Sequence, residues 1–161
     1  MTEVVVQDLL SDRKVRIPCK DYVKKVAVFE NRLAVQLSDK IVIFDIFNNN
    51  NNNNKSNNPL EENDAEEDIG FHVVDRIQKD LTCNLLIAVS RGIVLCLEQK
   101  LQLYDFKGQK QREWAMDSNI RYVKVIGGPP AREGLLIGLE NGVILKIIID
   151  NPFPVQLLKI G

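Results

Sequence analysis

Histidine and cysteine offer the widest range of catalytic and metal-binding chemistry, and this sequence holds few of either. His72 is the only histidine, and the three cysteines are Cys19, Cys83 and Cys96. A catalytic triad needs a histidine base held by a second residue, and a structural zinc site needs close pairs such as C-x-x-C. Neither arrangement occurs, so we expect no catalytic residue, no metal ligand, no cofactor and no enzyme activity.

The cysteines are odd in number, widely spaced and mostly flanked by strand-forming residues. This pattern argues against a disulfide framework. Free cysteine behaves as a small apolar residue and is usually buried. We therefore expect three reduced core cysteines in an intracellular protein.

Carboxylates are more regularly placed. Asp8, Asp45 and Asp105 recur in similar apolar surroundings. Acid–base catalysis needs two such groups at one site, whereas groups that recur at a structural period lie in successive repeat units. We expect a repeated structural role, in which each carboxylate accepts hydrogen bonds from nearby backbone or turn groups.

Two further clusters have simple structural explanations. Lys107, Lys110 and Arg112 surround a turn, either as a basic contact patch or, as we favour, as charges that protect an edge strand from mispairing. Gly127 and Gly128 could suggest a phosphate-binding loop, but no G-K-[ST] follows them, which favours a tight turn.

Bulk composition allows one globular domain, residues 1–161. The chain has 161 residues, 45% hydrophobic residues and a formal net charge of -1. Such a charge gives no general attraction to nucleic acid or to an anionic membrane. No apolar run approaches the roughly 20 residues of a membrane-spanning helix, and no signal sequence is evident at the N-terminus.

Short apolar runs separated by Gly, Pro, Asn or charged turns predict an all-β protein. The Asn141-Gly142 pair favours a two-residue type I′ hairpin turn. The expected strands are 3–9, 14–20, 23–30, 33–37, 41–47, 71–78, 84–89, 93–97, 101–106, 111–116, 122–126, 135–139, 143–149 and 154–160.

Residues 48–68 differ in kind from the rest. Seven consecutive asparagines precede an acidic run, and the whole segment contains almost no residue that a core would bury. Polar, charged segments of this type remain disordered, and long surface loops cost little closure entropy. We expect a disordered insert, with a partner-binding or phosphorylated tail as the alternative.

Three segments superimpose without gaps: 33–46, 93–106 and 135–148. Each is a strand that ends in leucine, a three-residue polar link and a second strand. The second strand carries Phe44-Asp45 and Tyr104-Asp105 in the first two copies, but Lys146-Ile147 in the third. These features indicate an internal repeat.

The repeat period identifies the fold. Asp8, Asp45, Asp105 and Ile147 are separated by 37, 60 and 42 residues, and without the insert the middle value falls to about 40. Four-stranded propeller blades repeat every 40 to 45 residues and often carry Trp-Asp here. Two strands before Lys20 and three sets of four after it give about three and a half blades of a partial WD40-type β-propeller. A ring needs about 4 to 8, so we expect open apolar faces and an incomplete ring.

The sequence also resembles a known family. The strings V-V-V-Q-D-L-L-S-D-R-K-V-R-I-P-C-K, V-K-K-V-A-V-F-E-N-R-L-A-V-Q-L and, within Ile120–Ile148, V-I-G-G-P-P-A-R-E-G-L-L-I-G-L-E-N-G-V-I-L-K-I are similar to WD-repeat subunits of intraflagellar transport complex A. The resemblance implies part of a propeller, a non-catalytic scaffold role in retrograde ciliary transport, cilium assembly and protein delivery, and residence in the cilium, basal body and cytoplasm. It also implies other complex A subunits and ciliary cargo as partners, with no nucleic acid and no membrane insertion.

Two alternatives remain open. One is a generic WD-repeat adaptor in another pathway. The other is a ligand-binding or enzymatic propeller with its site in the central channel. The first strands begin with Val23-Lys24-Lys25, Cys83-Asn84-Leu85 and Arg121-Tyr122-Val123, which do not converge on a catalytic set.

Overall fold

The computed structural model describes residues 2–7, 13–48 and 69–160, and these form 14 antiparallel strands. This part of the chain contains no helix, and hence none that is long and apolar enough to cross a membrane. The expected all-β class is confirmed, and every expected strand is present, although most begin or end one or two residues away from the expected bounds.

The strands make one two-stranded and three four-stranded sheets, each connected as a simple meander. The half blade contains β1 (Glu3–Gln7) and β2 (Lys14–Pro18). Blade 1 contains β3 (Lys25–Phe29), β4 (Arg32–Gln36), β5 (Ile41–Asn48) and β6 (Ile69–Ile77). Blade 2 contains β7 (Leu85–Val89), β8 (Gly92–Cys96), β9 (Lys100–Asp105) and β10 (Lys110–Ala115). Blade 3 contains β11 (Ile120–Gly127), β12 (Gly134–Leu139), β13 (Val143–Ile148) and β14 (Val155–Lys159).

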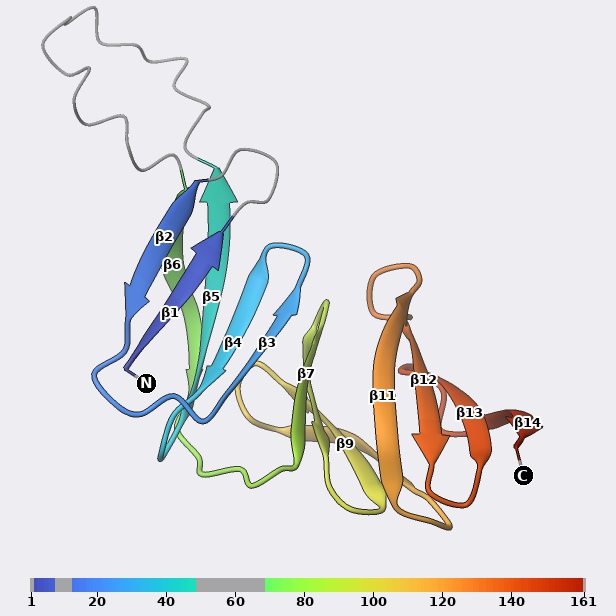
Figure 1. Ribbon diagram of the computed structural model, residues 1–161. Helices are drawn as coiled ribbons and strands as arrows, with labels where there is room; N and C mark the ends of the chain where they lie inside the picture. The colour runs from blue at the N-terminus through green and yellow to red at the C-terminus, as the bar shows by residue number, and fades with distance from the viewer. Residues whose placement is uncertain (1, 8–12, 49–68, 161) are drawn as a thin grey trace, which may run out of the picture.

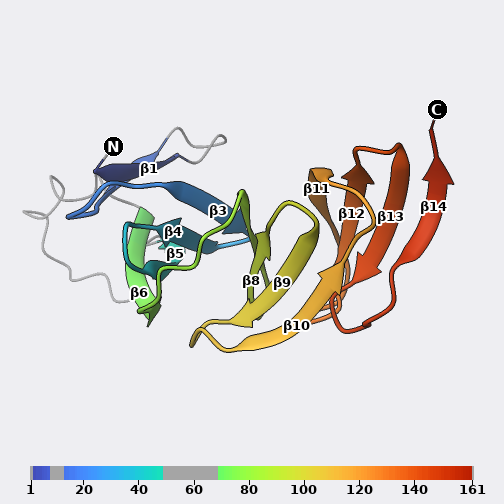
Figure 2. The same ribbon diagram turned by 90° about the horizontal axis from the view of Figure 1, so that it is seen from below.

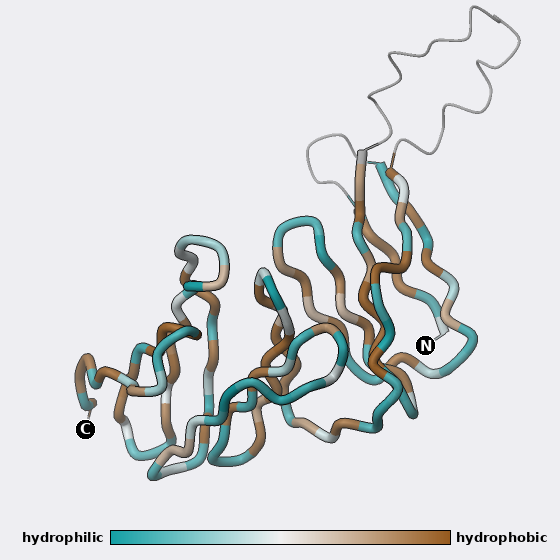
Figure 3. The backbone as a smooth tube through the Cα atoms, turned by 180° about the vertical axis from the view of Figure 1, so that it is seen from behind, coloured by the Kyte–Doolittle hydropathy of each residue, from teal (hydrophilic) through white to brown (hydrophobic). Residues whose placement is uncertain are grey.

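The sheets follow one another in a row, with the two ends of the chain at opposite ends of it (Figures 1 and 2). Hydrophobic residues run along the strands, whereas the turns are mostly hydrophilic (Figure 3). Three separate apolar cores fill the spaces between consecutive sheets. The structure is therefore a partial propeller of three and a half blades, as the sequence predicts.

Alternation along a central strand explains how one blade joins two cores, because successive side chains point to opposite faces. On β8, Ile93 and Leu95 pack toward blade 1, whereas Val94 and Cys96 pack toward blade 3. All five residues of β8 are buried. This accounts for the apolar strands without polar alternation that the sequence displays.

Blade 3 has a core on one face only. Leu135 and Ile137 of β12 are 0% exposed in the core shared with blade 2, whereas Leu136, on the other face, is half-buried. Leu136 lies in register between Lys124 and Lys146, and Tyr122 and Leu158 on the same face are exposed. We call this surface the open face of blade 3.

The β12–β13 turn corrects two sequence-based expectations. A type I′ turn needs positive φ at both central residues, but within Asn141-Gly142 only Gly142 has it, at 89°. The Gly142 amide donates to the Leu139 carbonyl at 3.1 Å, so the loop is a tight turn followed by a left-handed glycine. The last paired residues before this loop are Gly138 and Ile144, whereas the last pair before the corresponding loop of blade 1 is Gln36 and Ile41. The β12–β13 loop is therefore one residue longer.

That extra residue shifts the third repeat. Ile147 pairs with Leu135 as Phe44 pairs with Leu33, and so Ile148, not Ile147, occupies the position of Asp45. The ungapped superposition is therefore wrong by one residue in this strand.

The polar insert begins later than expected. Asn48 ends β5 opposite Ile69, and residues 49–68 lie outside the described residues. Asp8 also lies outside them, so its expected structural role stays a prediction.

Candidate functional site

Consecutive blades are joined by polar contacts through the β7–β8 turn at Ser90. The Arg32 Nη1 of blade 1 donates to the Ser90 carbonyl at 3.4 Å. The Ala131 amide of blade 3 donates to the Ser90 hydroxyl at 2.8 Å, and the Ser90 amide donates to Glu133 Oε1 at 3.1 Å. One serine thus contacts the blades on both sides.

Glu133 is an uncommon component of this junction because it is a carboxylate with 0% exposure. Its Oε1 accepts the Ser90 amide, and its own carbonyl accepts the Ile149 amide at 3.0 Å. Its Oε2 is buried without a partner among the described residues. Burying a carboxylate costs free energy because the group loses its contacts with water. For Glu133, the hydrogen bond from the Ser90 amide offsets part of that cost.

The loop that carries Ala131 and Glu133 confirms the expected tight turn. Gly127 and Gly128 have φ of 89° and 140°, and a Cβ on Gly128 would lie 2.6 Å from the Arg132 carbonyl oxygen. The Arg132 amide donates to the Pro129 carbonyl at 2.9 Å. Glycine is required here by turn geometry, and the loop serves as an inter-blade contact.

Asp45 and Asp105, on the third strands of blades 1 and 2, bind different groups. Asp45 forms an ion pair with Arg32 on the neighbouring strand, with Nε–Oδ1 at 2.8 Å. Asp105 Oδ1 accepts the amides of Lys107 and Gln109, both at 2.9 Å. The expected bonding to turn backbone is confirmed for Asp105 and is wrong for Asp45, where arginine stands directly opposite.

Arg32 has a further role between blades. Its guanidinium carbon lies 4.8 Å from the centre of the Phe106 ring, which belongs to the β9–β10 turn of blade 2. His72, which the sequence analysis placed in no metal site, is exposed with its Nε2 3.9 Å from Asp45 Oδ2. Among the described residues, no group of three or more His, Cys, Asp and Glu could hold a metal ion.

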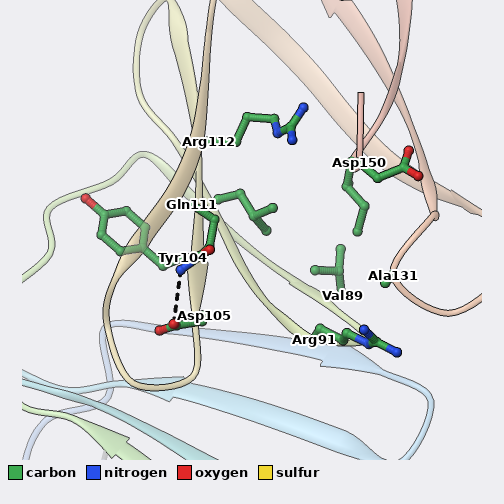
Figure 4. Close-up of a pocket in the computed structure, with 10 residues that line it drawn as sticks. Val89, Arg91, Tyr104, Asp105, Gln111, Arg112, Ala131 and Asp150 are labelled. Carbon is green, nitrogen blue, oxygen red and sulfur yellow. Dashed lines mark hydrogen bonds between the residues drawn. The ribbon is translucent and has the colours of Figure 1, made fainter. Parts of the chain in front are cut away.

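A groove of about 400 Å³ lies between blades 2 and 3 beside the Ser90 junction (Figure 4). Arg91 extends from the β7–β8 turn and Arg112 from β10, the outer strand of blade 2. Asp150 faces the groove from the turn after β13. The lining residues are Val89, Arg91, Leu103, Tyr104, Asp105, Gln111, Arg112, Ala131, Ile149 and Asp150.

The three residues of the basic cluster expected from the sequence do not form one patch in the structure. Lys107 in the β9–β10 turn and Lys110 at the start of β10 are exposed, and Lys110 Nζ lies 3.6 Å from Glu113 Oε1. Arg112 is half-buried and lines the groove instead. No pattern in the sequence pointed to Arg91, Ser90 or Asp150, although each lies in a turn at the end of a strand, where blade repeats expose side chains.

The cysteines are free and buried, as expected. Each of the three cores contains one of them, with Cys19, Cys83 and Cys96 in successive cores. Burial raises the pKa of all three thiols, that of Cys96 to about 11. Raised thiol pKa values make these groups poor nucleophiles at neutral pH.

Comparisons with known proteins agree with this architecture. The family model for the IFT122 second beta-propeller matches residues 1–161. The chain is 49% identical to intraflagellar transport protein 122 homolog of Xenopus tropicalis and 48% identical to that of Homo sapiens, each over 159 residues. These alignments cover 99% of this chain but only 12% of each relative.

Solved structures show the same fold at low identity. The crystal structure of BBS1N in complex with ARL6DN, soaked with lead, superimposes with a TM-score of 0.61 at 12% identity, covering 98% of this chain and 47% of that chain. Hsv2 of Kluyveromyces lactis superimposes with a TM-score of 0.54 at 12% identity, covering 98% of this chain and 44% of that chain.

Proposed function

Because the chain belongs to the IFT122 second beta-propeller family, we propose that it acts as a non-catalytic scaffold domain in intraflagellar transport complex A. The carrying observation is the match of the family model to all of residues 1–161, with 49% identity to a named homologue. The proposal includes retrograde ciliary transport, cilium assembly and delivery of proteins to the cilium. Its sites of action would be the cilium, the basal body and the cytoplasm.

The structure supports a binding role and offers little for catalysis. Near the Ser90 junction, Arg32 is paired with Asp45, and Glu133 and Asp105 accept backbone amides, so that none of these described groups forms a nucleophile–base pair. The described thiols are buried with raised pKa values. A scaffold role needs only surfaces that bind other proteins. The grooves between blades and the exposed edges of the blades provide such surfaces.

We propose that residues 1–161 act as one domain whose ring is completed by further blades. Ala34 and Val94, which the repeat places at the position of Leu136, are 1% and 0% exposed within inter-blade cores. Leu136 itself is half-buried on the open face. A neighbouring blade on that face would bury it equally.

The test is affinity capture from ciliated cells that express the complete polypeptide encoded by the gene with an epitope tag. Recovery of the other complex A subunits and of ciliary cargo, quantified by mass spectrometry, is the expected result. A control carrying Leu135→Glu, which places a charge in the core between blades 2 and 3, should lose them. Recovery of none of them by a folded protein would contradict the complex A assignment and would favour a generic adaptor.

A further inference from the structure

We propose that the groove between blades 2 and 3 binds an acidic side chain of a partner polypeptide, with Arg112 holding its carboxylate and Arg91 adding a second positive charge to the lining (Figure 4). The inference rests on the proposed scaffold function and deepens it by naming the chemistry of one bound segment.

The balance of paired and unpaired charges in the groove carries the argument. Asp105 accepts two turn amides through Oδ1 and the Gln111 side chain through Oδ2 at 3.1 Å. Asp150 Oδ2 is paired with Arg132 Nε at 2.8 Å. Neither the Arg91 nor the Arg112 side chain has an ion pair or a hydrogen bond within the described part of the chain. The groove therefore presents two arginine side chains that form no ion pair with its own carboxylates.

Arg112 is the more informative of the two because it is partly desolvated. Its Nη1 is buried and has no acceptor among the described residues. A guanidinium in this state has lost water without gaining a partner, which is unfavourable. A carboxylate on its accessible nitrogens would neutralise the charge, and the reduced local dielectric would strengthen the attraction. The planar fork of arginine matches the two oxygens of a carboxylate.

The corresponding groove between blades 1 and 2 differs, because its arginine is paired with a carboxylate. That groove is lined by Arg32, Asp45 and His72, among others, and Arg32 is already paired with Asp45. In blade 2, Gly92 stands opposite Asp105 where blade 1 has Arg32 opposite Asp45. A Cβ on Gly92 would collide with the Tyr104 carbonyl oxygen, so no side chain fits there. Asp105 consequently caps its own turn, and the arginines of this groove are left free.

The groove also fits the rest of an acidic side chain. Val89, Leu103 and Ile149 supply apolar lining, against which the methylene groups of a glutamate can pack. Its volume of about 400 Å³ accommodates more than one side chain. Both walls belong to complete four-stranded blades, so the groove does not depend on the open face.

The test uses the complete polypeptide encoded by the gene and a fluorescein-labelled hexaglutamate peptide, with hexaglutamine as the uncharged probe. Fluorescence anisotropy should show binding of hexaglutamate only, weakened by added salt. Arg112→Gln should weaken it about 10-fold or more, because a partly desolvated charge pair is lost. Arg91→Gln should weaken it about threefold, since this side chain is exposed.

Lys107→Gln is the matched control, because it removes one positive charge from the exposed β9–β10 turn outside the groove. It should change the affinity by less than about twofold. Arg112→Lys keeps the charge without the fork, and should bind more weakly than wild type but more tightly than Arg112→Gln. Circular dichroism establishes that each variant is folded.

Four results would overturn the inference: equal binding of both peptides, wild-type affinity in folded Arg112→Gln, an equal loss in Lys107→Gln, or binding of a phosphoserine peptide without hexaglutamate. If complex A subunits are still captured in any of these cases, the scaffold function stands and only the groove assignment fails. If the complex A subunits are not captured but Arg112→Gln still weakens hexaglutamate binding, the groove assignment stands and the scaffold function fails.

Discussion

At the scale of single residues, Asp45 and Asp105 show what a repeat can predict. Their equivalence follows from the sequence alone, and the structure places both on third strands, Asp45 within β5 and Asp105 at the end of β9. Their partners do not follow, because these depend on the residue across the ladder, Arg32 in one blade and Gly92 in the other. The blade repeat determines where each aspartate lies, whereas its hydrogen-bond partner depends on the residue opposite it in the folded sheet.

Cys96 provides a residue-scale prediction. Burial raises its pKa from the ordinary 9.0 to about 11, so the fraction of reactive thiolate near pH 8 falls about 100-fold. We expect N-ethylmaleimide to modify Cys96 at least that much more slowly in the folded protein than after denaturation in guanidinium chloride. Peptide mass spectrometry measures the two rates. Equal rates would show that the thiol is accessible and normally acidic.

The same shift predicts a pH dependence with a definite sign. A thiol whose pKa is raised by folding stabilises the fold fully below pH 9.0. That contribution is lost as the pH rises toward about 11, because the unfolded state loses its proton first. We expect the denaturation midpoint to fall over this window, and to fall less in Cys96→Ala. An identical fall in both proteins would assign the effect to other groups.

At the scale of elements, strand positions were predictable and turn geometry was only partly so. Apolar runs separated by turn residues located the described strands, and the signal is strongest for central strands such as β8, which are buried on both faces. The Asn141-Gly142 pair signalled a turn, yet its type depended on one extra residue that shifted the β12–β13 register. Similarly, Gly127-Gly128 marked a loop, but its contact with Ser90 of blade 2 could not be seen in the sequence.

Ser90 tests that inter-blade contact. Ser90→Ala removes the hydroxyl that accepts the Ala131 amide in a partly buried junction, which should cost about 1–2 kcal/mol of stability. Hydrogen–deuterium exchange should accelerate at the Ala131 amide, and peptide-level mass spectrometry resolves this segment within the complete polypeptide.

Ser118→Ala is the matched control, because it also removes a hydroxyl that accepts an amide, that of Asn141 at 3.2 Å, but at an exposed site within blade 3. We expect about 0.5 kcal/mol or less and no change at Ala131. Unchanged exchange at Ala131 in Ser90→Ala would mean that the loop is held by other contacts, such as that of Glu133 with the Ser90 amide.

At the scale of the whole molecule, the number of blades followed from counting strands and dividing by four. The sequence also indicated open apolar faces, because three and a half blades cannot close a ring. It did not indicate the Arg91–Arg112 groove. Those two arginines are 21 residues apart in the sequence and line one groove only because β7, β8 and β10 share one sheet, which is bordered by a loop of blade 3.

The open face of blade 3 gives a prediction whose sign depends on what surrounds the chain. In the isolated 161-residue chain, we expect aggregation or marginal stability, because apolar side chains such as Tyr122 and Leu158 remain exposed. Leu136→Glu should make that chain more soluble, since the new carboxylate lies in register between Lys124 and Lys146. Size-exclusion chromatography with light scattering measures the fraction of monomer. A wild-type chain that is monomeric and unfolds cooperatively would contradict this expectation.

In the complete polypeptide, the same substitution should be destabilising by about 3–5 kcal/mol if another blade covers the face, because it buries an unpaired charge. Leu135→Glu separates this effect from general damage, since Leu135 is 0% exposed in the core with blade 2 and should disrupt both proteins. Thermal denaturation of the three forms compares them directly. Opposite effects of Leu136→Glu in the two settings would identify the face as a blade interface, whereas a neutral effect in the complete polypeptide would show that it faces solvent there.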